Sequence, residues 1–224
     1  MGLPLDAAVG RERSPGAVRV FVVDSHELVR EGLRDFLEGE GLEVVGECWS
    51  AAEASRRIVE AGADVVVLDG RLPDGTGIEV CRYVRSVDSD LQCLMMTSYV
   101  DDEVLRGVVL AGAAGYVLRQ VRGHHLARAI RRAATGESLL GTEVVDRARA
   151  WFANATADPG FRDLTDAERE VLALIFEGLS NRQISEALGL AETKVCELVS
   201  TLLAKLGFGG NTGPAVAQPT DAGP

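Results

Sequence analysis

Short runs of apolar and β-branched residues alternate, along the first 135 residues, with longer segments in which apolar residues recur every three or four positions. The short runs predict strands and the longer segments predict amphipathic helices. Because five strands alternate with five helices, we expect an α/β fold with a five-stranded, doubly wound parallel sheet covered on both faces. The expected strands are Val18–Val23, Glu43–Cys48, Val65–Leu68, Cys93–Met96 and Gly115–Leu118, and the expected helices are Glu27–Leu37, Ala51–Val59, Ile78–Val84, Glu103–Leu110 and Leu126–Ala134.

After residue 135 the pattern is helical only. Residues 136–160 read as a linker with room for one short helix, Val144–Phe152, and residues 161–208 predict three helices with a tight middle turn, which is typical of an all-α helix-turn-helix domain. Residues 1–17 read as a flexible leader, and residues 209–224 as a Gly/Pro-rich tail with little room for a helix. Three segments have capping-box spacing, Ser50–Glu53, Thr165–Glu168 and Ser180–Gln183, and three glycines stand at expected helix ends, Gly178, Gly189 and Gly207.

Composition narrows the class of protein. A hydrophobic content of 46% with mixed charges is typical of a globular chain, and the net charge of -11 argues against a broad basic surface for nucleic acid or anionic membrane. Any DNA contact must therefore be local. The four cysteines are scattered without metal-ligand spacing, and no apolar run reaches about 18 residues, so we expect a cytoplasmic protein with reduced thiols and no membrane segment.

Four polar residues stand where strands of the predicted sheet end. Asp24 follows the first strand, Asp69 the third, Thr97 the fourth and Arg119 the fifth. An acid after a single strand is usually a loop residue or helix cap. Because the carboxyl ends of parallel strands lie along one edge, we expect two carboxylates, a hydroxyl and a cation to converge there. The histidine that follows, His26, is read simply as a polar residue at a helix start.

Several of these segments resemble a known family. "VLDGRLPDGTGIEVCR", "MMTSY", "AGAAGYVLRQ" and "LTDAEREVLALIFEGLSNRQISEALGLAETKVCELVSTLLAKLG" are similar to two-component response regulators of the NarL/FixJ class, which carry a LuxR-type helix-turn-helix. The resemblance implies a CheY-like (flavodoxin-like) receiver at residues 18–135 and a DNA-binding domain at 161–208, in a regulator that is not an enzyme. It also implies a sensor histidine kinase as partner.

The same resemblance assigns roles at the sheet edge. It implies that Asp69 is the phosphoacceptor, that Thr97 and Tyr116 are switch residues, and that Mg²⁺ is held by Asp24, Asp69 and the backbone carbonyl of Arg71. Arg119 would complete the clamp on the phosphoryl group.

Two residues depart from the family pattern. Ser25 stands where the family has a second acid, and Arg119 stands where it has Lys. A hydroxyl is a poorer ligand than a carboxylate for a hard cation, and the formal charge of the pocket changes from about -2 to about -1. We therefore expect weak Mg²⁺ binding and weak or atypical phosphorylation. Arg119 is also expected to pair bidentately with Asp69 or Asp24 without any phosphate.

The third helix of the helix-turn-helix carries the candidate recognition surface. Its outward residues near the start, together with two residues of the preceding helix, are candidate DNA contacts: Asn181, Arg182, Thr193, Lys194, Cys196, Glu197 and Thr201. The resemblance implies Lys and Asn in relatives at the positions of Thr193, Cys196 and Glu197. Residues 161–208 hold eight acids against five Lys and Arg, which weakens phosphate contacts. A basic fourth helix that helps dimerisation in relatives is replaced here by the Gly/Pro-rich tail.

Two functions remain open on these grounds. The first is a response-regulator transcription factor, in which phosphorylation controls promoter DNA binding. The second is a degenerate regulator that acts mainly by pairing with another response regulator or a kinase, as a homodimer or heterodimer. A haloacid-dehalogenase-type phosphatase fits worse, because Asp24-Ser25-His26 lacks the D-x-D pattern of that class.

Overall fold

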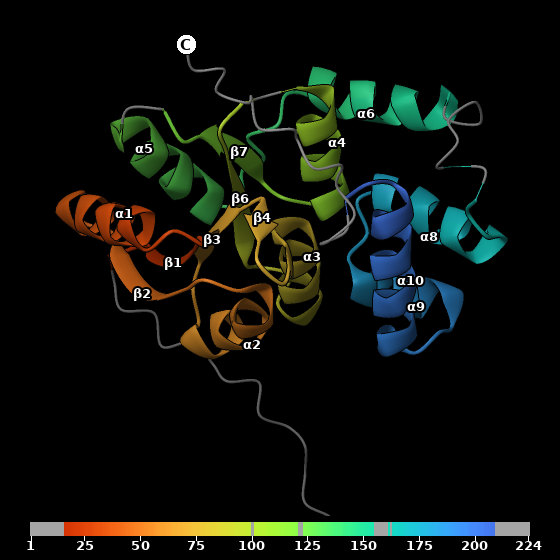
Figure 1. Ribbon diagram of the computed structural model, residues 1–224, viewed down its shortest axis with the longest axis horizontal. Helices are drawn as coiled ribbons and strands as arrows, with labels where there is room; N and C mark the ends of the chain where they lie inside the picture. Colours follow the sequence, from red (N-terminus) through yellow and green to blue (C-terminus); the bar gives the residue numbers. More distant parts are fainter. Residues whose placement is uncertain (1–15, 100, 121–122, 155–160, 162, 209–224) are drawn as a thin grey trace, which may run out of the picture.

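The computed structural model describes residues 16–99, 101–120, 123–154, 161 and 163–208 (Figure 1). A parallel sheet with strand order β2-β1-β3-β6-β7 forms its centre. All five strands were predicted from the sequence to within one residue at each end. They are β1 (Arg19–Val23), β2 (Glu43–Cys48), β3 (Val65–Asp69), β6 (Gln92–Thr97) and β7 (Gly115–Leu118). The sequence pattern missed a small antiparallel hairpin of β4 (Arg71–Leu72) and β5 (Gly75–Thr76), because two-residue strands leave no periodicity.

Helices cover both faces of this sheet, as expected for a doubly wound fold (Figure 1). One face packs against α1 (Glu27–Gly39) and α5 (Gly123–Ala134), and the other packs against α2 (Ala51–Ala61), α3 (Gly77–Val87) and α4 (Asp102–Ala111). Successive side chains of a strand point to opposite faces, so the two apolar clusters draw on alternate residues of the same strands. Together these strands and helices form the α/β domain.

In its described part, up to residue 154, the linker carries the helix α6 (Thr142–Asn154), which confirms the predicted helix and extends it at both ends. This helix packs against α4. The guanidinium of Arg106 lies 4.5 Å from the ring centroid of Trp151, and the ring of Phe161 meets the Trp151 ring edge-on at 5.0 Å. Trp151 therefore contacts both α4 and the residue that leads into the C-terminal domain.

Within residues 163–208 the helical domain carries α8 (Asp166–Phe176), α9 (Asn181–Leu188) and α10 (Glu192–Lys205), at the places where three helices were predicted. Complete capping boxes open α8 at Thr165 and α9 at Ser180. The predicted box at Ser50 is wrong in one half. The Ser50 hydroxyl accepts from the backbone N–H of Glu53, but the Glu53 carboxylate pairs with Arg57 at 2.6 Å instead of returning to the cap.

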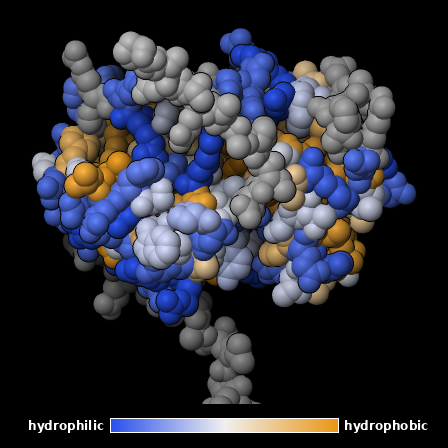
Figure 2. Space-filling model, in the orientation of Figure 1, coloured by the Kyte–Doolittle hydropathy of each residue, from blue (hydrophilic) through white to orange (hydrophobic). Residues whose placement is uncertain are grey.

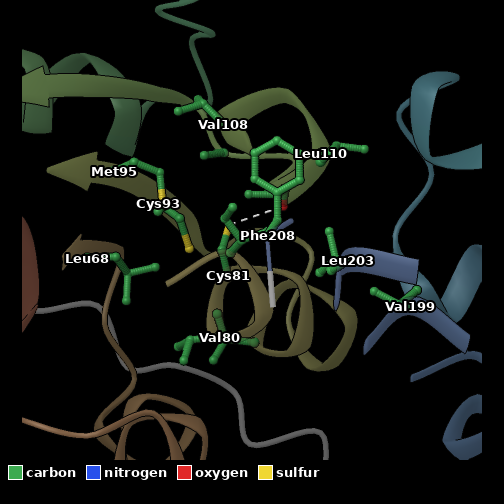
Figure 3. Close-up of a cluster of buried hydrophobic side chains, with 14 of the residues drawn as sticks. Leu68, Val80, Cys81, Cys93, Met95, Val108, Leu110, Val199, Leu203 and Phe208 are labelled. Atoms are coloured by element: carbon green, nitrogen blue, oxygen red, sulfur yellow. Dashed lines mark hydrogen bonds between the residues drawn. The ribbon is translucent and has the colours of Figure 1, made fainter. Parts of the chain in front are cut away.

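One apolar core runs through both domains. Figure 3 shows Leu68, Cys93 and Met95 from the sheet, Val80 and Cys81 from α3, and Val108 and Leu110 from α4 close to Val199, Leu203 and Phe208 of the helical domain. The thiol of Cys81 donates a hydrogen bond to the carbonyl of Ala111 at 3.2 Å. Outside this core, the face drawn in Figure 2 is mostly hydrophilic, with hydrophobic residues in scattered patches. The helical domain is thus packed against the α/β domain.

Candidate functional site

The sheet topology brings three of the four predicted strand-end residues into contact. Asp24 follows β1, Asp69 ends β3, and Arg119 follows β7. The side chain of Asp24 is 0% exposed and that of Asp69 is 11% exposed, while Arg119 reaches them from the rim with 22% exposure. The two carboxylates and the cation therefore converge at one edge, as the strand pattern predicted.

Arg119 joins the two aspartates through a single nitrogen. Its Nη2 lies 2.8 Å from Oδ2 of Asp24 and 2.7 Å from Oδ2 of Asp69. The contact with Asp24 is an ion pair whose angles are poor for a hydrogen bond. We expected both arms of the guanidinium to bind one carboxylate, whereas the structure has one arm between two carboxylates.

The remaining carboxylate oxygens also face nitrogen atoms of the chain. Oδ1 of Asp24 accepts a hydrogen bond from the backbone N–H of His26 at 2.8 Å. The imidazole Nδ1 of His26 lies 3.1 Å from the same oxygen. Oδ1 of Asp69 accepts from the backbone N–H of Arg71 at 3.4 Å. The hydroxyl of Ser25 lies 3.1 Å from Nδ1 of His26. All four oxygens of the two aspartates are thus already in contact with protein nitrogens.

Burial and charge act in opposite directions on these groups. Burial raises the pKa of Asp69 above its ordinary value, and the neighbouring Asp24 adds to this rise, while the hydrogen bond from Arg119 partly opposes it. Burial acts to lower the pKa of Arg119, but Asp69 and Asp24 outweigh it and hold that pKa above its ordinary value. The guanidinium therefore stays charged and supplies the cation that the two carboxylates require.

The pocket offers a divalent ion few free ligands. Receiver-type pockets generally hold Mg²⁺ at acidic residues, and ligand atoms of Asp24, His26 and Asp69 do lie within 4.8 Å of one another. Mg²⁺ prefers oxygen ligands in near-octahedral geometry. Here the carboxylate oxygens of Asp24 and Asp69 already contact Arg119 and backbone N–H donors, and Ser25 supplies no carboxylate. The residues present therefore fit Mg²⁺ poorly. The sequence pattern missed the place of the His26 imidazole beside Asp24.

The two predicted switch residues lie near this edge without joining the ion cluster. Thr97 is the last residue of β6, and its hydroxyl donates to the backbone carbonyl of Tyr99 in the following loop at 2.7 Å. Tyr116 lies in β7, half-buried against the apolar core. The hydroxyl of Tyr99 accepts a hydrogen bond from Arg71 at 3.2 Å. The roles of Thr97 and Tyr116 and the metal contact of the Arg71 carbonyl stay predictions.

The candidate DNA contacts divide into two groups. Arg182, Thr193, Lys194, Glu197 and Thr201 are exposed, as predicted. Two of the cations are paired with acids of their own helix: Arg182 with Glu186 at 3.4 Å and Lys194 with Glu197 at 3.0 Å.

The other group lies against the α/β domain, contrary to the prediction of an outward surface. Asn181 is 2% exposed and Cys196 is half-buried. Both line a cavity of about 320 Å³ between the domains, together with Arg82 and Tyr83 of α3. The sequence pattern correctly placed these two residues outside the apolar core of the helical domain. It carries no information about a second domain that packs against them.

Comparison with known proteins agrees with this arrangement of an acidic strand edge and a helix-turn-helix. Residues 20–131 match the response regulator receiver domain, and residues 162–216 match the bacterial regulatory proteins of the luxR family. The chain belongs to the LuxR-family response regulators. As a family member it is a transcription regulator with a receiver and a DNA-binding domain, and it is not an enzyme.

Individual relatives cover most of the chain. It is 48% identical over 202 residues to the DNA-binding transcriptional activator DevR/DosR of Mycobacterium tuberculosis, over 89% of this chain and 93% of that protein. It is 35% identical to the transcriptional regulatory protein LiaR of Bacillus subtilis, over 89% and 95%. Among solved structures, a LuxR-family response regulator from Aurantimonas sp. SI85-9A1 gives a TM-score of 0.54 at 32% identity, over 60% of this chain and 97% of that one.

These matches confirm the family that the sequence segments predicted. Phosphorylation of an aspartate is general to the family, and Asp69 is the acid that ends the central strand here. None of the helices in the described ranges is long and apolar enough to cross a membrane. The predicted loss of a fourth helix falls on residues 209–224, outside the described residues.

Proposed function

We propose that this regulator acts in the cytoplasm as a promoter-binding transcription factor, whose receiver is phosphorylated weakly on Asp69 by a sensor histidine kinase. The observation that carries the proposal is the ion cluster of Asp24, Asp69 and Arg119. The cluster contains the phosphoacceptor Asp69, but Oδ2 of Asp69 contacts the guanidinium of Arg119. Phosphorylation is therefore retained but slowed.

The chemical step explains why the cluster slows the reaction. A carboxylate oxygen of Asp69 forms a bond to phosphorus while the P–N bond of the kinase phosphohistidine breaks, and the histidine leaves with the electron pair. Oδ2 of Asp69 must first give up its 2.7 Å contact with Arg119. A weakly bound Mg²⁺ would offset little of the charge. After transfer, the same guanidinium is suited to bind the phosphoryl oxygens bidentately.

Phosphorylation with a small donor tests this proposal. Mass spectrometry after incubation with acetyl phosphate and Mg²⁺ is expected to show slow, partial modification of the wild type and none of Asp69→Asn. The double variant Ser25→Asp/Arg119→Lys, which restores the family pattern, is expected to react faster. Rapid and near-complete modification of the wild type would contradict the proposal.

We also propose that the receiver controls DNA binding by covering part of the recognition surface. Asn181 and Cys196 are candidate DNA contacts that face α3 of the receiver, so DNA binding requires the domains to separate. Footprinting of wild type, Asp69→Asn and Asp69→Glu tests whether Asp69 governs this separation. Identical occupancy of promoter DNA in all three would show that phosphorylation is not the switch.

A second function is favoured by the charges of the output domain. Two of its exposed cations, Arg182 and Lys194, are already paired with acids, and an acidic surface weakens contacts with DNA phosphates. In this alternative the protein pairs with a related response regulator, as a heterodimer, and modifies its activity. A mobility-shift assay at low salt separates the two functions. Binding by this chain alone, as a homodimer, supports the transcription factor, and binding only with a full-length relative supports the alternative.

A further inference from the structure

Arg82 connects the two domains from inside their interface. It belongs to α3 of the receiver and is 4% exposed. Its Nε and Nη2 donate to Oδ1 of Asn181 at 3.0 and 2.8 Å, and Nη2 also donates to the carbonyl of Leu179 at 3.2 Å. Its Nη1 donates to the carbonyl of Leu110 in the receiver at 2.8 Å. One guanidinium therefore holds the turn that opens α9 against α3 and α4.

The acceptors of this buried cation are neutral. In the described part of the chain, Arg82 donates to one side-chain amide and two backbone carbonyls. Burial lowers the pKa of Arg82 to about 10, so it remains charged at neutral pH. A buried charge without an opposite charge loses hydration that hydrogen bonds to neutral groups restore only in part. Removing the guanidinium, however, leaves Oδ1 of the buried Asn181 without its two donors in the closed arrangement, and that loss opposes closure of the domains.

Asn181 is fully engaged by this arrangement. Its Oδ1 accepts both bonds from Arg82, and its Nδ2 donates to Sγ of Cys196 at 3.6 Å. Both ends of the amide are thus used, and the side chain is 2% exposed. Asn181 cannot bind a DNA phosphate or base edge while it binds Arg82.

The interface around this polar contact is incompletely filled. A groove of about 730 Å³ lies between α3 and α10, lined by Tyr83 and Val87 on one side and by Thr193, Cys196 and Glu197 on the other. The apolar core beside this groove is, by contrast, tightly packed: a Cβ added at Gly107 would lie 3.2 Å from the ring of Phe208. The recognition helix therefore faces the receiver across an open groove, and the Arg82–Asn181 contact is a specific polar link beside the shared apolar core.

We propose that Arg82 is a positioning residue that holds the output domain on the receiver, and that Asn181 binds either Arg82 or DNA. The inference rests on the proposed DNA-binding function and assigns the residue that restrains it. Removing Arg82 opens the domains and frees Asn181. Giving the guanidinium a negative partner at position 181 closes them more firmly.

Cys196 reports on this equilibrium in the full-length protein. It is half-buried at the interface, whereas Cys48, Cys81 and Cys93 are buried. Its rate of alkylation by N-ethylmaleimide, followed by mass spectrometry, measures how often the domains separate. Arg82→Met is expected to raise this rate about tenfold or more, which is the typical effect of losing hydrogen bonds to a charged group. Arg85→Met is the matched control, because Arg85 of the same helix donates to Gly112 within the receiver.

A second variant acts in the opposite direction and requires a folded, closed protein. Asn181→Asp is expected to slow alkylation at least severalfold, because an ion pair replaces a charge–amide bond. A carboxylate also slows a nearby thiol directly, so the double variant Arg82→Met/Asn181→Asp separates the two effects and is expected to react faster than Asn181→Asp alone. The inference is overturned if Arg82→Met and Arg85→Met change the rate equally, or if the double variant reacts as slowly as Asn181→Asp.

A mobility-shift assay of Arg82→Met distinguishes this inference from the proposed function. Faster alkylation together with stronger binding to promoter DNA supports both. Faster alkylation without any DNA binding supports the positioning role of Arg82 and contradicts DNA binding by this chain alone.

Discussion

Replacing Arg119 with alanine tests whether the guanidinium serves as the resident cation of the pocket. In Arg119→Ala the buried carboxylates of Asp24 and Asp69 lose the charge that lies 2.8 and 2.7 Å from them. Like charges in one buried site repel each other, so the folded protein is expected to lose stability at neutral pH. The variant pocket, with two acids and no cation, should also bind Mg²⁺ more tightly than the wild type.

The size of this loss follows from the geometry. Two unit charges about 4 Å apart attract by about 4 kcal/mol at an effective dielectric constant of about 20, so the two pairs supply about 8 kcal/mol before desolvation. Desolvation and the repulsion between the carboxylates offset more than half of this attraction. Removing one partner of a buried ion pair costs about 3–5 kcal/mol, and the 22% exposure of Arg119 places the expected loss near 3 kcal/mol.

Urea unfolding at pH 7, followed by circular dichroism with and without MgCl₂, measures both effects. A Mg²⁺ concentration 100 times the dissociation constant restores about 2.7 kcal/mol to the variant. Arg71→Ala is the matched control, because it removes one positive charge from the exposed side of the same edge, where Arg71 donates to the Tyr99 hydroxyl. The reasoning is refuted if Arg119→Ala is as stable as Arg71→Ala, or if Mg²⁺ stabilises the wild type as much as the Arg119 variant.

Four further predictions concern single positions. Ser25→Asp should raise the affinity for Mg²⁺ about tenfold, measured by titration calorimetry, and an unchanged affinity would count against the missing ligand as the cause. The pKa of Asp69 in the folded protein is raised above 3.8, so at pH values just above 3.8 the folded chain binds more protons than the unfolded chain. The contribution of Asp69 to stability should therefore fall as the pH rises through its folded pKa. Urea midpoints of Asp69→Asn should lack this fall, and parallel pH curves for variant and wild type would refute it. Gly77→Ala should lower the free energy of unfolding by about 1–3 kcal/mol, because the new Cβ would lie 2.3 Å from the carbonyl oxygen of Asp69. Gly70→Ala is the control, because its Cβ would meet nothing within 4 Å. Equal losses of stability in thermal unfolding would be inconsistent with this prediction. Thr165→Ala should cost about 1 kcal/mol through loss of the capping box, and Thr165→Ser, which keeps the hydroxyl, should cost less in the same assay.

The sheet and its acidic edge could be predicted because local patterns decide them. β-branched runs mark strands buried on both faces, and the residue after each run falls at the strand end, so Asp24, Asp69 and Arg119 could be placed together before any coordinates. The capping box from Thr76 to Glu79 was missed although its spacing is present in the sequence. It opens α3 immediately after the small β4–β5 hairpin.

The contacts between the domains could not be predicted from such patterns. Arg82 and Asn181 are separated by 99 positions, and each reads as a surface residue of its own helix. An arginine on an amphipathic helix is usually exposed, and its burial here depends on a second domain whose docking leaves no periodic signal. For the same reason the half-burial of Cys196 was not foreseen.

The position of Trp151 gives the protein a natural optical reporter. The chain has two tryptophans, and the other, Trp49, is an exposed residue that follows β2. The emission of Trp49→Phe would arise from the indole that lies between Arg106 of α4 and Phe161 at the entry to the output domain. Because α6 packs against α4, separation of the output domain would move the Phe161 ring away from this fluorophore while Arg106 stays beside it. Opening kinetics can therefore be followed by stopped flow without any attached dye.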